Sequence, residues 1–346
     1  MFKKKKKNIW QKLKYKKPEG FFVLAPMADV TDNPFRKIIN QIGKPDLFYT
    51  EFGATDGLAS EKGYKRIKTQ IFNFEKNQKP IIAQIFGGKP ENYKEVAKKV
   101  ANMGFDGIDL NTGCPQKNIL KQKSGSELIK EENWDLVRQI IQNIKKGIKE
   151  SKNQIPFSLK TRIGFNQYNK EWIKFLLEQK LDALIIHLRT KKEMSKVQAH
   201  WELAKELTEL KNKISPNTVL IFNGDIKSKK EGFQKLKENG ADGIMIGRGI
   251  FENPTLFRDQ DFSKKSVQEK TKIMLKHAKY FEKEFGKTFK NKILFGGRIK
   301  PFALMKKFFK IYINGFDGAK EFREHLMKAN SLKEVEQVVK NHLKKL

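Results

Sequence analysis

The chain alternates short apolar runs with amphipathic stretches, and this alternation constrains the fold more than any other feature. Each run is rich in Ile, Leu, Phe or Val, and the stretches between runs have helical periodicity and the length to cross back over a sheet. Continuous apolar strands separated by helices predict an α/β protein with a parallel sheet covered on both faces. Eight strands are expected, at residues 21–27, 47–52, 81–86, 107–110, 157–162, 183–188, 219–223 and 243–247.

Eight strand–helix units suit a closed (β/α)8 barrel, the TIM barrel, which takes about 250 residues. An open doubly wound sheet is the alternative, because periodicity does not show whether a sheet closes. After about residue 260 only helical spacing continues, at 263–285, 299–313, 318–329 and 331–346. The sequence therefore predicts a basic extension at 1–17, a catalytic barrel at 18–259 and a C-terminal all-helical domain at 260–346.

Positive charge is concentrated at the two ends of the chain. The net charge is +33; residues 1–17 contain nine lysines and no acidic residue, and residues 260–346 contain 22 Lys and Arg against 9 Asp and Glu. Basic surfaces beside a catalytic body are expected where a polyanion binds, so a nucleic acid is the favoured partner of the helical domain. The other explanation is that lysine serves throughout as a general solubilising residue.

Cysteine usage and hydropathy narrow the class of protein. Cys114 is the only cysteine, which excludes an intrachain disulfide and most cysteine-based metal sites and fits a reducing compartment. No run of eighteen apolar residues is present, and the lysine-rich start lacks the apolar segment of a signal peptide. We expect a cytoplasmic monomer with no metal, no membrane contact and no obligate protein partner.

The residues that follow the predicted strands carry the chemistry, because parallel barrels place their active sites at the carboxyl ends of the strands. Cys114 follows the fourth strand and could exchange a proton with a group held above the sheet, although most free cysteines are small buried hydrophobes. Lys160 and His187 are single basic residues that could instead be structural. The remaining candidates are Pro26, Met27, Ala28, Gln84, Asn111, Arg162, Arg189, Asn223, Gly224, Asp225, Gly247 and Arg248.

The last two strands end in glycine-containing segments. Asn223-Gly224-Asp225 and Gly247-Arg248-Gly249 match a phosphate cradle, in which glycines let backbone N–H groups approach an anion. Barrels commonly hold a phosphate after strands seven and eight. Two cations, two amides, this cradle and a thiol on one rim together describe a flavin mononucleotide site with a proton donor beside it.

These segments resemble, in order and in spacing, the motifs of the bacterial tRNA-dihydrouridine synthases. The most diagnostic is Asn111-Thr112-Gly113-Cys114-Pro115, and the resemblance runs from about residue 21 to 330. It implies an FMN-containing barrel followed by a helical domain, with tRNA lying across both. The other matching segments are Leu24-Ala25-Pro26-Met27-Ala28, Thr31-Asp32-Asn33-Pro34-Phe35-Arg36, Lys160-Thr161-Arg162-Ile163-Gly164, Asn223-Gly224-Asp225-Ile226 and Gly243-Ile244-Met245-Ile246-Gly247-Arg248-Gly249.

The resemblance also implies a reaction and a role for each candidate. NADPH or NADH would supply electrons through FMN to reduce the C5=C6 bond of specific tRNA uridines to 5,6-dihydrouridine. Cys114 would donate the proton and Asn111 would hold the uracil, while Arg162 and Arg189 would contact RNA. Lys160 and His187 would face the N1/C2 side of the flavin. Pro26, Met27, Ala28 and Gln84 would contact its ring, and Asn223, Gly224, Asp225, Gly247 and Arg248 would bind its ribityl and phosphate groups.

Two positions depart from the family pattern. Thr112 stands where Met is usual and Leu188 where Gly is usual, and residues 191–200 lack the common Tyr-x-Gly, so a different RNA-contacting loop is expected.

Two other functions are possible, although each accounts for fewer features of the sequence. One is a flavin-dependent dihydroorotate or dihydropyrimidine dehydrogenase acting on a free small molecule, which needs no basic helical domain. The other is a non-enzymatic RNA-binding protein that keeps the barrel as a scaffold.

Overall fold

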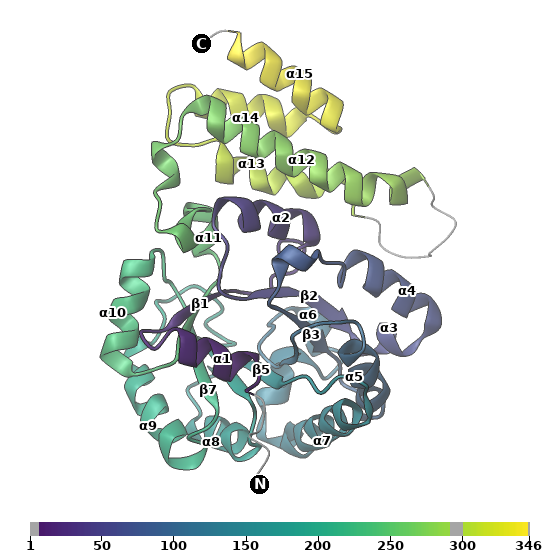
Figure 1. The fold of residues 1–346 in the computed structure, drawn as a ribbon, viewed down its shortest axis with the longest axis vertical. Helices are drawn as coiled ribbons and strands as arrows, with labels where there is room; N and C mark the ends of the chain where they lie inside the picture. The colour runs from purple at the N-terminus through teal and green to yellow at the C-terminus, as the bar shows by residue number, and fades with distance from the viewer. Residues whose placement is uncertain (1–6, 291–299, 345–346) are drawn as a thin grey trace.

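Eight parallel strands form a closed barrel (Figure 1). The computed structural model describes residues 7–290 and 300–344, apart from the side chains of 287–290. The sheet order is β1-β8-β7-β6-β5-β4-β3-β2, and β1 meets β2 through a parallel bridge between Val23 and Leu47. The barrel is therefore confirmed over the open sheet. The strands are β1 Phe21–Leu24, β2 Phe48–Ala54, β3 Ile81–Phe86, β4 Gly107–Asn111, β5 Phe157–Gly164, β6 Ala183–Thr190, β7 Val219–Asn223 and β8 Gly243–Ile246.

Helices surround the strands, as the alternating sequence predicts. Two strands are shorter than expected: β8 ends one residue early, and β1 stops at Leu24 because Pro26 has no N–H to continue the ladder. The barrel helices are α2 Asn33–Ile42, α3 Thr55–Ala59, α4 Glu61–Gln70, α5 Tyr93–Ala101, α6 Lys117–Leu120, α7 Trp134–Glu150, α8 Lys170–Glu178, α9 Ala204–Ile214, α10 Lys229–Asn239 and α11 Gly249–Glu252, with 3-10 turns η1 Lys76–Gln78, η2 Pro90–Asn92, η3 Gly125–Ile129, η4 Glu131–Asn133, η5 Trp201–Leu203 and η6 Leu256–Arg258.

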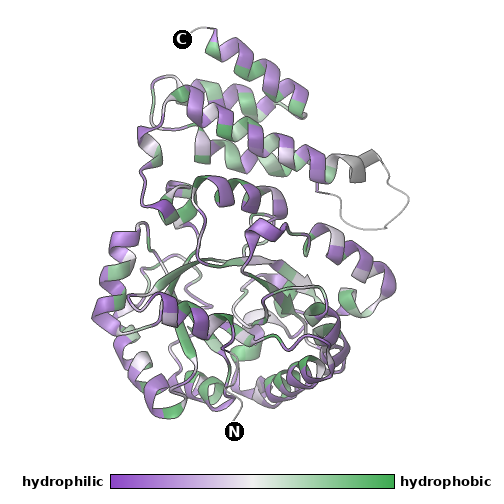
Figure 2. Ribbon diagram, in the orientation of Figure 1, coloured by the Kyte–Doolittle hydropathy of each residue, from purple (hydrophilic) through white to green (hydrophobic). Residues whose placement is uncertain are grey.

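The core lies on both sides of the strands. Alternate residues point inward and outward, so Phe21 and Val23 fill the barrel whereas Phe22 and Leu24 pack under the outer helices. The inner cluster also contains Tyr49, Ile82, Ile185, Ile221 and Met245. Figure 2 shows the strands as mostly hydrophobic and the outer helices as largely hydrophilic. Side chains therefore fill the part of the barrel near the amino-terminal ends of the strands, here called the lower barrel. A binding site is then expected at the carboxyl ends of the strands.

Four aspartates organise the amino-terminal end of the barrel. One precedes each even-numbered strand, and its carboxylate accepts a backbone N–H from the strand before it. Such carboxylates satisfy N–H groups at the ends of the ladders. The pairs repeat with nearly the same length: Asp46 with Phe22, Asp106 with Ile81, Asp182 with Phe157 and Asp242 with Leu220, at 2.8, 2.9, 2.8 and 2.8 Å.

Helix α1 (Ile9–Lys16) covers this end of the barrel. Asn8 donates to Asp182 at 2.7 Å, and Lys14 and Lys17 pair with Asp242 and Asp46 at 2.7 and 2.6 Å. Trp10 is fully buried against the rings of Phe21 and Tyr49. The basic start is therefore partly a barrel cover, at the end opposite the strand carboxyl termini. The sequence also suggests the Lys3 to Lys7 tract as a set of phosphate contacts, and of these residues Lys3 to Lys6 lie outside the described part of the chain.

Replacing Trp10 with Ala should destabilise the protein by about 3–5 kcal/mol, because it removes a large buried ring and leaves a cavity. Urea unfolding followed by circular dichroism measures this loss. Tyr15 of the same helix is 73% exposed, so Tyr15→Ala should change stability by no more than about 0.5 kcal/mol. If the two variants unfold at the same urea concentration, α1 does not hold the barrel as described.

Helices after residue 260 form a bundle against α2, which confirms the helical C-terminal region (Figure 1). Ser331 caps its last helix, as its sequence pattern predicts, by accepting the N–H of Glu334. At the contact with the barrel, Phe308 packs on Phe35 with ring centroids 5.2 Å apart. The elements are η7 Phe262–Lys264, α12 Val267–Lys290, η8 Phe302–Met305, α13 Lys306–Tyr312, α14 Ala319–Lys328 and α15 Leu332–Leu343. Among the described helices, none combines the length and apolar character that a bilayer crossing needs.

A buried ion cluster joins this bundle to the barrel rim. Lys300, two residues before η8, places Nζ 2.7 and 2.9 Å from the two carboxylate oxygens of Glu51 in β2. Asp32 and Asp29, in the loop after β1, lie 3.5 and 3.8 Å from the same nitrogen. The Lys300 side chain is 9% exposed, so these charges interact with little screening by water.

Candidate functional site

A cavity of about 1400 Å³ opens at the carboxyl ends of the strands. The sequence-predicted site residues come from seven strand ends and their loops, and the barrel brings all of them to this one cavity. Their individual roles stay predictions. The predicted residues that line it are Pro26, Met27, Ala28, Gln84, Asn111, Cys114, Lys160, Arg162, His187, Arg189, Asn223, Gly224, Asp225, Gly247 and Arg248.

The end of β4 presents the thiol. Asn111 is the last residue of the strand, and its Oδ1 accepts the N–H groups of Gly113 and Cys114, both at 3.0 Å. This turn lifts Cys114, which is half-buried, to the cavity wall. Burial raises the pKa of the thiol, while the Gln116 N–H and the cations Arg162 and Lys160 oppose that rise. Cys114 therefore carries its proton at neutral pH and can act as an acid.

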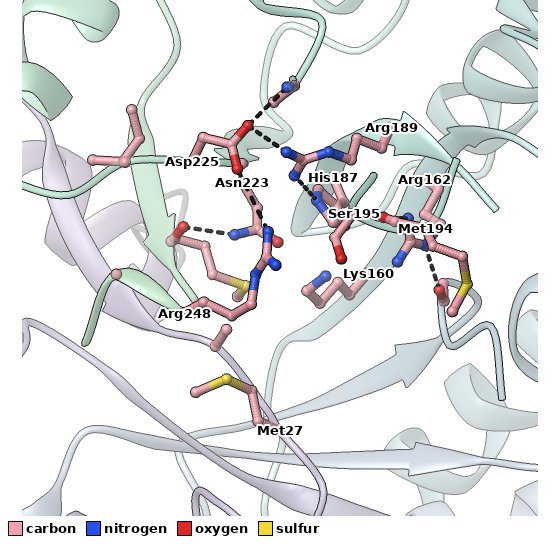
Figure 3. A pocket seen from close by; sticks show the side chains of 18 of the residues that line it. Met27, Lys160, Arg162, His187, Arg189, Met194, Ser195, Asn223, Asp225 and Arg248 are labelled. Carbon is pink, nitrogen blue, oxygen red and sulfur yellow. Dashed lines mark hydrogen bonds and ion pairs between the residues drawn. The ribbon is translucent and has the colours of Figure 1, made fainter. Parts of the chain in front are cut away.

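Lys160 and His187 supply two different nitrogen groups. Lys160 Nζ makes no hydrogen bond or ion pair with another described residue, and burial lowers its pKa to about 8. His187 Nε2 lies 3.2 Å from the Arg189 guanidinium (Figure 3). Because arginine can only donate, Nε2 accepts and Nδ1 carries the proton. Burial, with Arg162 and Lys160 nearby, holds the pKa of His187 well below its usual value, so the imidazole is neutral.

Arg162 and Arg189 each bond to the loop of residues 191–200 and to other residues at the strand ends. Arg162 donates to the carbonyl oxygens of Gly113, Thr190 and Met194 at 2.8, 3.0 and 3.0 Å. Arg189 donates to the Val197 carbonyl at 2.8 Å and to the Asp225 carboxylate. Both arginines are buried. In this structure they fix the loop that forms one wall of the cavity, and the RNA contact expected of them stays a prediction.

The ends of β7 and β8 form the most crowded wall. Gly224 has φ 151°, and a Cβ there would lie 2.5 Å from the Ala199 side chain, so only glycine fits. Asp225, also at positive φ, accepts the Ala199 N–H at 2.8 Å and lies 3.6 Å from Arg248. Arg248 is 59% exposed, which leaves donor groups of its guanidinium available to an anion.

Sequence reasoning missed several residues of this site. Phe52, Met245 and residues 194–198 also line the cavity, and Asp109 lies directly beneath it with its carboxylate bonded to Gln84. The period of two along β4 and β8 could have identified Asp109 and Met245, because both face inward with residues that were singled out. The loop carries no motif. Within the described residues, no three His, Cys, Asp or Glu side chains are arranged to hold a metal ion.

Comparison with known proteins identifies the family. Residues 23–346 match the family model described as "Dihydrouridine synthase (Dus)". The chain belongs to this family. Among named dihydrouridine synthases, "Probable tRNA-dihydrouridine synthase" of Staphylococcus aureus is 39% identical over 333 residues, covering 95% of this chain and 94% of that one. "Probable tRNA-dihydrouridine synthase 2" of Bacillus subtilis is 38% identical with the same coverage. A solved structure of morphinone reductase in complex with tetrahydroNAD is 13% identical, with a TM-score of 0.44, over 68% of this chain and 86% of that one.

The two departures from the usual dihydrouridine synthase pattern do not line the cavity. Thr112 is fully buried, and its hydroxyl donates to the Lys160 carbonyl at 3.2 Å. Leu188 is fully buried in the apolar cluster under the outer helices. Both are therefore packing residues of this dihydrouridine synthase. The altered loop, residues 191–200, does reach the cavity, through Met194 to Ala199.

Proposed function

We propose that the protein reduces the C5=C6 bond of uridines in tRNA to 5,6-dihydrouridine, using bound FMN and electrons from NADPH or NADH. The observation that carries the proposal is the place of Cys114, a thiol whose pKa burial raises, on the wall of a cavity that it shares with Asn111, Lys160 and His187. The cavity, at about 1400 Å³, exceeds the 300–1,000 Å³ of ordinary ligand pockets, as a flavin and a pyrimidine together require. Relatives named as tRNA-dihydrouridine synthases support tRNA as the substrate.

The residues present fit FMN. Met27 and Ala28 offer an apolar face for a flat ring, and Lys160 is a cation without a partner among the described residues. Arg248 offers an exposed guanidinium for a phosphate beside Gly224, whose wall leaves no room for a side chain. Bound FMN would supply the hydride that the reduction needs. Lys160 would stabilise negative charge at the edge of the ring, and neutral His187 would donate from Nδ1 without adding a second positive charge.

The chain itself would supply the proton and the orientation of the base. Cys114 would protonate C5 of the uracil, and Arg162 and Lys160, which already oppose the rise in its pKa, would stabilise the thiolate that remains. Asn111 has one N–H that no described residue accepts, because its other amide hydrogen goes to Gln84 and its oxygen holds the turn. That N–H would bind a uracil carbonyl. The target base must leave its stack to arrive here, which costs about a few kcal/mol.

Purified protein tests this function directly. We expect the absorption bands of bound flavin, and dihydrouridine in tRNA after incubation with NADPH, detected by mass mapping of the tRNA. Protein that binds no flavin would instead point to an RNA-binding scaffold. Turnover of free uracil or orotate without tRNA would favour the small-molecule reductase.

We also propose that the helical domain at 260–346 binds the tRNA. Lys307 and Lys310 are exposed on α13, and Lys307 lies within electrostatic range of Asp29 and Asp32, in the loop that follows the cavity residue Ala28. Lys307 is thus placed near the loop that follows β1, and Lys310 is exposed three residues further along α13. The divisions at 17/18 and 259/260, the monomeric state and the cytoplasmic location remain part of this proposal.

Neutralising both lysines, Lys307→Gln with Lys310→Gln, should weaken tRNA binding and reduce the slope of log affinity against log salt by about 1–2, because each phosphate contact releases about one counterion. Filter binding over a range of salt concentrations measures the slope. The matched control replaces Lys333 and Lys340, which are exposed on α15, the helix farthest from the barrel in Figure 1. An equal effect of the two double variants would show that α13 makes no particular contact.

A further inference from the structure

Asp109 is a fully buried carboxylate with no direct access to the cavity. It lies in the middle of β4, and the sheet register pairs it with Gln84 on β3 and Ser158 on β5. Its Oδ1 accepts the Ser158 hydroxyl at 2.6 Å, and its Oδ2 accepts Nε2 of Gln84 at 2.8 Å. A hydrogen-bond donor on each side is expected for a buried carboxylate, but only one of these two donors, Gln84, also lines the cavity.

The bond to Gln84 determines the orientation of two amides. A carboxylate can only accept, so the NH₂ end of Gln84 must face Asp109 and its Oε1 must face away. That Oε1 accepts Nδ2 of Asn111 at 3.0 Å. Asn111 therefore turns its Oδ1 to the N–H groups of Gly113 and Cys114, both at 3.0 Å. If Gln84 reversed, Asn111 would have to reverse too, and its NH₂ would meet two N–H donors.

We propose that Asp109 is a positioning residue. It fixes the amide orientation of Gln84, which in turn fixes the amide orientation of Asn111 and so the backbone turn that carries Cys114. The inference rests on the proposed function, since Gln84 and Asn111 are the residues expected to meet the flavin and the uracil. Asp109 lies outside the cavity, yet it would determine which end of each amide inside the cavity donates a hydrogen bond and which end accepts one.

The orientation does not depend on whether Asp109 is ionised. Burial raises its pKa to about 7, while bonds from Ser158 and Gln84 and the Lys160 charge oppose the rise. The other titratable group that faces Asp109 is Tyr49. Burial and the nearby Asp109 charge both raise the pKa of Tyr49 well above its usual value. A proton on Asp109 would sit on Oδ1, because Ser158 can accept as well as donate whereas the Gln84 NH₂ cannot accept. Oδ2 then still accepts from Gln84.

The first test compares loss of both bonds of this carboxylate with loss of one. Asp109→Leu removes the bonds to Gln84 and to Ser158, whereas Ser158→Ala removes only the bond that leads away from the cavity. We expect Asp109→Leu to lower kcat/KM for tRNA by about 10–100-fold, as loss of a group that orients site residues commonly does. It should also change the rate at which iodoacetamide alkylates Cys114. Ser158→Ala should stay within about threefold of the wild type in both. Equal effects of the two variants overturn the proposal and leave Asp109 a merely structural residue.

The second test uses near-isosteric variants that keep the packing. Gln84→Glu places a second carboxylate against that of Asp109, so the two repel, and the rate of Cys114 alkylation should change. Adding Asp109→Asn restores the hydrogen bond, because the new amide at residue 109 donates its NH₂ to one carboxylate oxygen of residue 84. The other oxygen of residue 84 again accepts from Asn111. Alkylation in the double variant should return to within about threefold of the wild-type rate, although the flavin contact of Gln84 is lost. Absence of this rescue overturns the proposal. Because the readout is thiol chemistry, it stands apart from the tRNA assay, whose failure in the wild type would instead overturn the proposed function.

Discussion

Replacing Cys114 with Ala should lower dihydrouridine formation in tRNA by at least about 100-fold, since a positioned general acid contributes about 10²–10⁴-fold to a rate. The thiol lines the cavity, and burial keeps its pKa raised, so it is the protonated sulfur group beside the expected uracil position. Removing one sulfur atom leaves Met27, Lys160 and Arg248 in place. Mass mapping of the product should therefore show the loss while the visible flavin bands persist.

Cys114→Ser is the matched control for this change. The hydroxyl keeps the size and the backbone turn that Asn111 holds, but it is a far weaker acid than the thiol. We expect Cys114→Ser to resemble Cys114→Ala in rate and the wild type in flavin binding. Retained wild-type activity in Cys114→Ala would remove the thiol from the mechanism and leave proton donation to solvent.

Replacing Lys300 with Met should destabilise the protein by about 3–5 kcal/mol, because removing one partner leaves buried charges uncompensated. Lys300 is the cation that Glu51 and Asp32 share, and burial raises the pKa of both carboxyls while Lys300 opposes that rise. Without it their pKa values rise further above the unfolded values. Urea unfolding at several pH values measures the effect. The deficit should be largest at neutral pH and shrink as the pH falls, because these carboxyls then bind protons and no longer leave buried negative charges without a partner.

An exposed ion pair serves as the control for Lys300. Lys65 pairs with Glu61 at 2.7 Å on α4, with the two side chains 59% and 83% exposed. Lys65→Met should change stability by no more than about 0.5 kcal/mol. Adding Glu51→Gln to Lys300→Met should recover part of the loss. If Lys300→Met is as stable as the wild type at neutral pH, the cluster does not hold the bundle to the barrel.

The fold was predictable because its signal is local and repeated. Each strand is an apolar run bounded by turn residues, and β3 and β7 begin and end where expected. Strand ends then had to converge, because parallel strands of a closed barrel share one carboxyl end. Residues placed immediately after strands, such as Cys114 and Arg248, could therefore be assigned to one site from their position alone.

What could not be predicted depends on contacts between distant segments. Arg162 and Arg189 looked like free cations, but their burial follows from a loop that carries no motif. Lys300 is one of many lysines, and nothing near it in the sequence indicates that the folded chain places three carboxylates around it. Trp10 stands in a lysine-rich tract, where its spacing from Ile9 and Leu13 was the one sign of a packed helix.

The cover formed by α1 limits how the cavity can be reached. With the lower barrel packed and its base capped by Trp10, the described chain leaves the cavity accessible from the rim at the carboxyl ends of the strands. Under the proposed function, the nicotinamide that delivers electrons and the base that receives them must share this single entrance. They must therefore alternate, and one must leave the rim before the other can enter.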